Sequence, residues 1–207
     1  MNSPVLSVDN LNVVFHQDGK TAHIVHDVSF KVHAGRCLGI LGESGSGKSM
    51  SCKAVLRLLD KNFEISGNVR FKGEDLLAKS NEQIRRMRGS RITMVLQNPM
   101  SCFDPLYRIG DQIGETFREH TDWSATQILE ESVSMLELMR IHNPQEVLRK
   151  YPHQLSGGML QRIMIGIAMA LQPELLIADE PTTAIDAITQ YEILEEFIRI
   201  KKQKNTA

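Results

Sequence analysis

A glycine-rich run that ends in lysine and serine is the clearest chemical motif in the sequence. The pattern G-x-x-x-x-G-K-[ST] is formed by Gly42, Glu43, Ser44, Gly45, Ser46, Gly47, Lys48 and Ser49. Glycines let the backbone wrap around phosphate with its N–H groups inward, the lysine reaches the β- and γ-phosphates, and the serine hydroxyl ligates Mg²⁺. The run therefore predicts a phosphate loop. A dinucleotide-binding loop is excluded because Met50 stands where a third glycine is required.

Two carboxylates follow an apolar run much further along the chain. Leu175–Ala178 predicts a buried strand, and Asp179 and Glu180 come directly after it. Phosphoryl transfer needs a carboxylate near the metal and a group that orients the attacking water. We therefore expect Asp179 to serve the metal and Glu180 to act as general base, because ligands gather at the carboxyl ends of parallel strands. Without the phosphate loop, the pair would be interpreted as a solvated helix start.

Two adjacent glycines, Gly157 and Gly158, precede a nearly uncharged helical pattern that ends at Pro173. Ser156 is a favourable helix N-cap, while Gly157 and Gly158 leave backbone amides exposed at the positive end of the helix. The three residues predict an anion site without a phosphate loop of its own. A capped helix start that binds nothing is the alternative for the three residues taken alone.

These groups require strands to hold them. Alternating apolar and polar residues predict strands over Val5–Phe15, His23–Val32 and Ser66–Phe71, with a turn at residues 17–20. Cys37–Leu41 is a short apolar run that predicts a buried strand leading into the phosphate loop. A helix should follow the loop, with one apolar face formed by Cys52, Val55, Leu56 and Leu59.

The chain turns helical between about Asn98 and Tyr151. Ser124 and Gln127 form a capping box, and Pro144 stands at the first turn of a further short helix. The last helix is expected from about Thr189 to Lys201. Strand, glycine loop, helix and a later apolar strand together indicate an α/β core that carries a helical insertion.

Composition excludes several classes of protein. The 207 residues carry a formal net charge of −1, so no general basic field attracts nucleic acid, and Arg85–Arg88 is interpreted as a solvated helix end. Three separated cysteines (Cys37, Cys52 and Cys102) fit a reducing cytoplasm better than disulfides or a zinc site. The longest apolar run, Ile163–Leu171, is far shorter than the ~20 residues of a membrane span. No signal peptide is recognised, so we expect a cytoplasmic protein.

Four histidines near the N-terminus invite a metal-site interpretation: His16, His23, His26 and His33. Strand alternation places His23 and His26 on opposite faces, and no acidic cluster joins them. We expect these histidines to be solvated strand and turn residues.

The sequence resembles the ATP-binding-cassette (ABC) ATPases over almost its whole length. The motifs of this family occur in order: the phosphate loop, "VLQNP" at 95–99, "LSGGM" at 155–159, "LLIADE" at 175–180 and "AID" at 184–186. The resemblance implies an α/β fold of the P-loop NTPase, ABC type, in a single domain over 1–207. Residues 1–97 and 156–207 would form a RecA-like core with an antiparallel β subdomain, and about 98–155 a helical subdomain.

The resemblance also implies roles for individual residues. Gln97 would contact Mg²⁺ or its water and link ATP to the helical subdomain, which docks on a transmembrane subunit. Residues 156–158 would bind the γ-phosphate of ATP held by the second subunit of a head-to-tail dimer. Asp186 would organise the dimer interface. Phe15 would stack on adenine, with an ordinary core phenylalanine as the alternative.

Longer stretches are similar to the oligopeptide, dipeptide and nickel importer ATPases, among them "YPHQLSGGMLQR" and "ADEPTTAID". Met159 and Leu160 favour the nickel and metallophore importers. The resemblance then implies ATP hydrolysis coupled to uptake of nickel or a metal chelate, at the cytoplasmic face of a bacterial membrane. Implied partners are a second ATPase subunit, two transmembrane permeases and an extracytoplasmic solute-binding protein, but no nucleic acid. The alternatives are a peptide importer, a soluble ABC ATPase acting on DNA or ribosomes, and a remnant that binds ATP only.

The C-terminal end departs from the family pattern. Family members continue into a strand that ends in a switch histidine, but none of the seven histidines lies after Glu180. The C-terminal strands of the core are also expected to be lacking. We therefore expect this chain to bind ATP but to hydrolyse it poorly.

Overall fold

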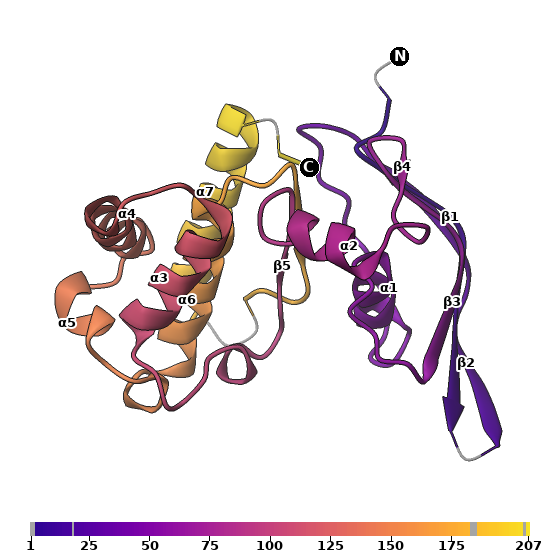
Figure 1. The fold of residues 1–207 in the computed structure, drawn as a ribbon, viewed down its shortest axis with the longest axis horizontal. Coiled ribbons are helices and arrows are strands. Elements are labelled where there is room, and N and C mark those ends of the chain that lie inside the picture. Colours follow the sequence, from indigo (N-terminus) through magenta and orange to yellow (C-terminus); the bar gives the residue numbers. More distant parts are fainter. Residues whose placement is uncertain (1–2, 18, 183–185, 205) are drawn as a thin grey trace. The chain divides into compact units, whose positions relative to one another are not determined.

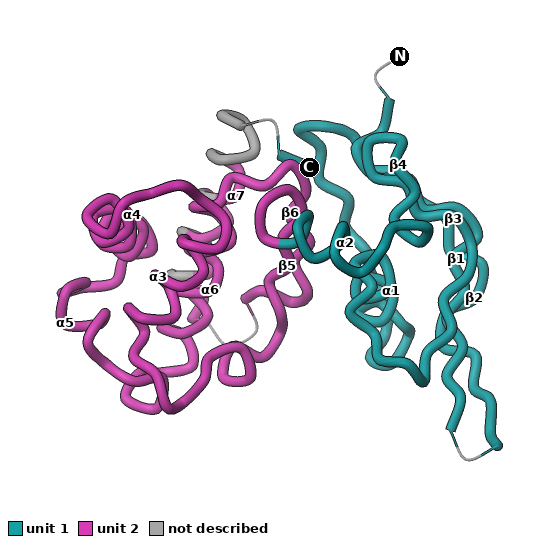
Figure 2. Tube along the Cα trace, viewed as in Figure 1, with its two compact units in different colours: residues 1–88, 204–207 teal, residues 89–203 magenta. Residues whose placement is uncertain are grey.

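The computed structural model describes residues 3–17, 19–182, 186–204 and 206–207 (Figure 1). The chain divides into two compact units, which are described separately below. Unit 1 contains Met1–Arg88 with Lys204–Ala207, and unit 2 contains Gly89–Gln203 (Figure 2). Within the described ranges, no helix is long and apolar enough to cross a membrane.

Unit 1 is built on an antiparallel sheet in the order β2-β1-β3-β4. Its strands are β1 (Leu6–Gln17), β2 (Lys20–Val32), β3 (Phe63–Phe71) and the short β4 (Glu74–Asp75). The three predicted strands are confirmed, with ends that differ from the prediction by up to three residues. Apolar side chains of β1 and β3 are fully buried on one face and form the core of this unit, among them Val8, Leu11, Val69 and Phe71.

Bulges interrupt the alternation of β1 and β2. The pairing register shifts between Val8 and Leu11, and Asn10 between them has a φ of 53°. One additional residue moves the buried positions of β1 from even to odd numbers, because each residue reverses the side-chain direction. Asp27 on β2 also has a positive φ, 45°, and its carboxylate accepts a hydrogen bond from the Asn10 amide.

Unit 1 also contains two helices, α1 (Lys48–Val55) and α2 (Asn81–Met87). The helix predicted after the phosphate loop is confirmed as α1, but it ends before Leu56 and Leu59, which were expected on its apolar face. Helix α2 begins with a capping box between Ser80 and Gln83. Arg85 and Arg86 bond to Glu82 at the exposed surface of α2. Arg88, however, donates to the backbone oxygens of Leu56 and Arg57, both at 2.6 Å. The expectation of a solvated helix end is therefore wrong for Arg88, and burial lowers the pKa of its guanidinium.

The buried strand predicted over Cys37–Leu41 is not formed. In the described structure these residues run outside both sheets, and Leu41 is 97% exposed. A strand requires a neighbouring strand for its hydrogen bonds. Unit 1 offers only the antiparallel sheet, in which Cys37–Leu41 takes no place.

Unit 2 contains a parallel pair of strands, β5 (Ile92–Val95) and β6 (Leu175–Ala178). The apolar strand predicted at 175–178 is confirmed, whereas β5 was not foreseen. The register aligns Ile92 with Leu175 and Val95 with Ala178, so both strands end at the same level.

Helix α6 (Gly157–Ala170) forms the centre of unit 2. Leu160, Ile163 and Ile165 are completely buried in one continuous apolar core. Gly166 allows a close approach, because a Cβ at this position would lie 2.4 Å from Sδ of Met135. The helix and its cap at Ser156 are as predicted.

The remaining helices of unit 2 pack around this core (Figure 1). They are α3 (Ile109–His120), α4 (Ala125–Leu138), α5 (Pro144–Leu148) and α7 (Ala187–Lys204). The capping box at Ser124 and the start of a helix at Pro144 are confirmed. The predicted helical segment between Asn98 and Tyr151 thus corresponds to α3, α4 and α5.

Candidate nucleotide site

The phosphate loop has the backbone of an anion-binding turn. Gly45 and Gly47 adopt positive φ values of 79° and 88°, and α1 begins at Lys48 directly after them. Gly47 carries no side chain that could cap the first N–H groups of α1. These groups and the helix dipole therefore favour an anion at the loop.

Gly47 is also confined by its surroundings. A Cβ there would lie 2.9 Å from the Ile24 carbonyl oxygen and 3.2 Å from Cγ2 of Val25, both on β2. A Cβ on Gly45 would meet no described atom within 4 Å. Close packing against β2 thus fixes the C-terminal end of the loop, while the middle of the loop is open.

Lys48 currently bonds within its own loop. Its Nζ donates to the carbonyl oxygens of Gly42 and Glu43, each at 2.7 Å. The ammonium group holds the loop in a curved form, and these carbonyls would compete with phosphate oxygens for the same donors. The ammonium group of the predicted lysine therefore faces the backbone at the start of its own loop.

Phe15 lies near the end of β1, partly exposed, and is paired in register with Phe63 on β3. The two ring centroids are 4.8 Å apart with an interplanar angle of 42°. This is a common geometry for an aromatic pair. Phe15 is thus partly exposed and packed on Phe63, and its stacking on adenine stays a prediction.

Unit 2 brings the other predicted groups to the ends of its parallel strands. Gln97 follows β5, and Asp179 and Glu180 follow β6. The Asp179 amide donates to the Val95 carbonyl at 2.9 Å, which extends the ladder by one bond. Asp179 is 7% exposed, whereas Gln97 and Glu180 are exposed. The Gln97 amide Nε2 donates to Oε2 of Glu180 at 2.7 Å.

These contacts suit a hard cation. Because Nε2 of Gln97 is directed at Glu180, its Oε1 points elsewhere and is the atom that could ligate a metal or water. Asp179 of the same unit supplies a carboxylate, and Mg²⁺ prefers such oxygen ligands. The donor set therefore fits Mg²⁺. Among the described residues, no three His, Cys, Asp or Glu side chains gather as a metal site of their own.

The start of α6 is an open helix N-terminus. The Ser156 hydroxyl accepts a hydrogen bond from the Met159 amide at 3.2 Å, which occupies one of the free N–H groups. A Cβ on Gly157 would meet no atom of the described residues within 4 Å. A ligand can therefore approach the backbone at Gly157, as an anion site requires.

The first two residues of the "AID" motif, 184 and 185, lie outside the described residues. Asp186 is described and exposed, and its carbonyl oxygen accepts from the Gln190 amide at 2.8 Å in the first turn of α7.

The interpretation of the histidines requires a correction. His23 and His26 do not lie on opposite faces, because their rings stack with centroids 5.2 Å apart and an interplanar angle of 13°. The register of β2 gains one residue between Val25 and His23, which reverses the alternation at that point. His16 lies nearby in the sequence and bonds to Glu64 at 3.2 Å.

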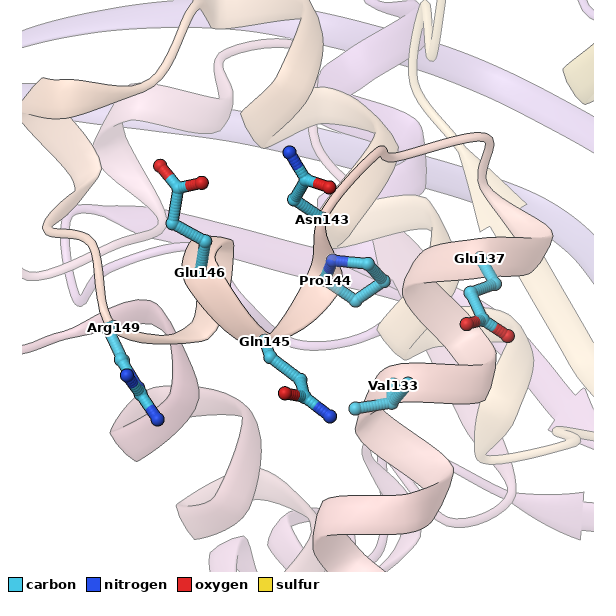
Figure 3. Close-up of a pocket in the computed structure, with 7 residues that line it drawn as sticks. All are labelled: Val133, Glu137, Asn143, Pro144, Gln145, Glu146 and Arg149. Carbon is cyan, nitrogen blue, oxygen red and sulfur yellow. The ribbon is translucent and has the colours of Figure 1, made fainter.

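A separate groove of about 500 Å³ lies between α4 and α5 (Figure 3). Its lining is of mixed polarity and consists of Val133, Glu137, Asn143, Pro144, Gln145, Glu146 and Arg149. Glu146 is bonded to Lys150 at 2.7 Å, and this contact lowers the pKa of its carboxyl. The groove contains none of the residues predicted to bind nucleotide.

Comparison with known sequences identifies close relatives. A family model described as ABC transporter matches residues 25–183. The metal-staphylopine import system ATP-binding protein CntD of Staphylococcus aureus is 44% identical over 89% of this chain and 68% of its own length. The dipeptide transport ATP-binding protein DppD of Bacillus subtilis is 42% identical over 98% of the chain, which spans 61% of that protein. The glutathione import ATP-binding protein GsiA of Salmonella typhimurium is 43% identical over 97% of the chain and 33% of its own length.

Solved structures show the same fold. The ATP-binding cassette MJ0796, in a dimeric post-hydrolysis state with ADP and phosphate, superposes with a TM-score of 0.87 at 21% identity. The match covers 97% of this chain and 85% of that structure. A further structure, described as an ATP-binding subunit of an ABC transporter, gives a TM-score of 0.76 at 24% identity.

Proposed function

Because this chain belongs to the ABC transporter ATPases, we propose that it powers an importer that takes up nickel or a metal chelate. The chain is an ABC-type ATPase that binds ATP. The observation that carries the choice of a metal chelate is the 44% identity to the metal-staphylopine import protein. Met159 and Leu160, which follow the glycine pair at the start of α6, motivate the choice of nickel.

We assign the chemistry to the residues of the sequence motifs. The loop from Gly42 to Ser49 holds the phosphates of ATP, and Lys48 exchanges its present carbonyl partners for phosphate oxygens. By the roles that the motifs imply, Asp179, Gln97 and Ser49 would hold Mg²⁺, and this ion would neutralise charge on the phosphates. Glu180 accepts a proton from the attacking water. The 2.7 Å hydrogen bond from Gln97 to Glu180 supports a shared site for the metal and the water.

A second ATPase subunit completes each site in this proposal. Residues 156–158 of one subunit bind the γ-phosphate of ATP held on the phosphate loop of the other. The open backbone at Gly157 and the positive end of α6 support this assignment. Asp186 is the proposed contact between the two subunits.

The proposed permease contact follows Gln97 along the chain. Met100, Leu106 and Tyr107 are 50%, 79% and 57% exposed, and such apolar side chains are typical of a protein interface. Two permeases and an extracytoplasmic solute-binding protein complete the transporter, with this chain at the cytoplasmic face. The position of the segment directly after Gln97 would link permease movement to the nucleotide.

An uptake experiment tests the transported solute. Labelled nickel, a labelled nickel chelate and a labelled dipeptide are offered to a strain lacking the gene and to the complemented strain. Uptake of either nickel form that depends on the gene supports the proposal. Uptake of the dipeptide alone would favour the second candidate, a peptide importer, which the 42% identity to the dipeptide transport protein supports.

The role of Glu180 has its own test. Glu180→Gln removes the carboxylate but preserves the side-chain shape, so ATP binding should persist while the hydrolysis rate falls. Because ATP is then retained, the dimer should accumulate and be visible by size-exclusion chromatography. Hydrolysis at the unchanged rate would exclude Glu180 as the general base.

A further inference from the structure

Gln161 is a polar side chain enclosed in the apolar core of unit 2. It lies on the second turn of α6 and is 0% exposed. Its neighbours Leu160 and Ile163 on the same helix are also completely buried. A glutamine amide loses its hydration when buried, so a glutamine at this place needs partners.

The partners of Gln161 are two backbone carbonyls. Nε2 donates to the Pro181 oxygen at 2.7 Å and to the Leu96 oxygen at 3.5 Å. Carbonyl oxygens accept but cannot donate, so the NH₂ group must face them, and this fixes the orientation of the amide. Its Oε1 is buried and has no hydrogen-bond partner among the described residues.

The two carbonyls belong to the segments that carry the proposed catalytic groups. Leu96 directly precedes Gln97, and Pro181 directly follows Glu180. The side chains of Gln97 and Glu180 in turn meet at 2.7 Å. A single buried amide thus bridges the backbone on either side of this contact. Because Ser156 caps α6, the same helix links these segments to the proposed site for the partner's phosphate.

We propose that Gln161 is a positioning residue that holds the Leu96 and Pro181 backbones so that Gln97 and Glu180 meet in the geometry that hydrolysis requires. This inference rests on the proposed roles of Gln97 and Glu180. In this role Gln161 acts through the two segments that its amide contacts. The hydrogen bonds of Gln161 also connect the first turns of α6 to the segments that follow β5 and β6.

Two substitutions separate positioning from simple packing. Gln161→Met keeps the length and volume of the side chain but removes both donors, and such swaps are tolerated in cores. Gln161→Glu keeps the shape but directs a carboxylate oxygen at two carbonyl oxygens, which repel it. Gln145→Met is the matched control, because Gln145 on α5 is exposed. Fluorescence of Trp123, the single tryptophan, verifies that unit 2 of each variant is folded.

The first readout is the kinetics of ATP hydrolysis. Gln161→Met should lower kcat on the order of 10- to 100-fold, as does the loss of groups that orient a catalytic residue, with KM for ATP nearly unchanged. Gln161→Glu should lower kcat further, and Gln145→Met should match the wild type. A kcat for Gln161→Met within twofold of the wild type would overturn the proposal.

The second readout does not depend on turnover. Hydrogen exchange of the peptides covering 92–98 and 175–182 should accelerate in Gln161→Met, while α3 exchanges at the wild-type rate. Unchanged exchange at both strand ends would overturn the proposal, as would equal acceleration throughout unit 2. If the wild type neither binds nor hydrolyses ATP, the proposed function fails, whereas the exchange rates still decide the role of Gln161.

Discussion

Replacing Gly47 by alanine tests how closely the phosphate loop packs on the sheet. Two costs arise at this position: alanine at a φ of 88° is strained, and its Cβ would lie 2.9 Å from the Ile24 carbonyl oxygen. Positive φ costs a non-glycine residue on the order of 1 kcal/mol, and forcing a methyl group into packed structure costs ~1–3 kcal/mol. We therefore expect Gly47→Ala to destabilise unit 1 locally by about 2–4 kcal/mol.

Gly45→Ala provides the matched control. Gly45 has a similar φ of 79°, but its Cβ would meet no described atom within 4 Å, so only the conformational cost of about 1 kcal/mol remains. Hydrogen exchange of β2 and α1 in nucleotide-free protein measures the free energy of local opening in unit 1. Trp123 fluorescence in urea follows unit 2, where neither substitution acts directly. Equal losses for the two alanine variants would refute the close approach to Ile24 as the cause.

Three further predictions concern other parts of the molecule. Gly166→Ala places a Cβ 2.4 Å from Sδ of Met135 and should cost ~1–3 kcal/mol in urea unfolding. In a double-mutant cycle with Met135→Ala the two losses should be less than additive, and additive losses would contradict this contact. Phe15→Ala should weaken ATP binding by ~1–3 kcal/mol but leave binding of inorganic tripolyphosphate unchanged, and equal weakening of both in calorimetry would rule out stacking on adenine. Hydrogen bonds from Arg85 and then Arg86 lower the pKa of Glu82 to about 2 from 4.5. Its contribution to stability is therefore present above pH ~4.5 and lost as the pH falls to ~2, so acid unfolding of Glu82→Gln should lack this slope; identical acid profiles would oppose the assignment.

The motifs that could be predicted from the sequence depend on neighbouring residues. The turn at 42–47 requires glycine at its positive φ positions. Helices α4 and α6 are each preceded by a serine, Ser124 or Ser156, whose hydroxyl accepts a hydrogen bond from the backbone N–H three residues later. Each of these features is defined by residues within one turn of one another. Local chemistry therefore sufficed to find the phosphate loop and the start of α6.

Features that depend on distant residues were not foreseen. The short β5 has only four residues, and its pairing partner β6 lies some eighty positions later in the chain. The burial of Gln161 likewise follows from β5 and β6 together, because its amide bonds to the segment after each strand. Cys37–Leu41 shows the opposite error, since an apolar run indicated a strand although unit 1 offers it no ladder. A glutamine within an otherwise apolar helix face was the one sequence signal that could have drawn attention to Gln161.

The histidines show where alternation stops predicting the face of a strand. Period-two reasoning holds only between bulges, because each additional residue exchanges the two faces. Asn10 and Asp27 mark two of these points, and asparagine and aspartate are the residues that most readily accept positive φ after glycine. An Asn or Asp within a predicted strand is therefore a place where the face assignment should be restarted. Applied to β1, this rule explains why Val8 and Leu11, at positions of opposite parity, are buried in the same core.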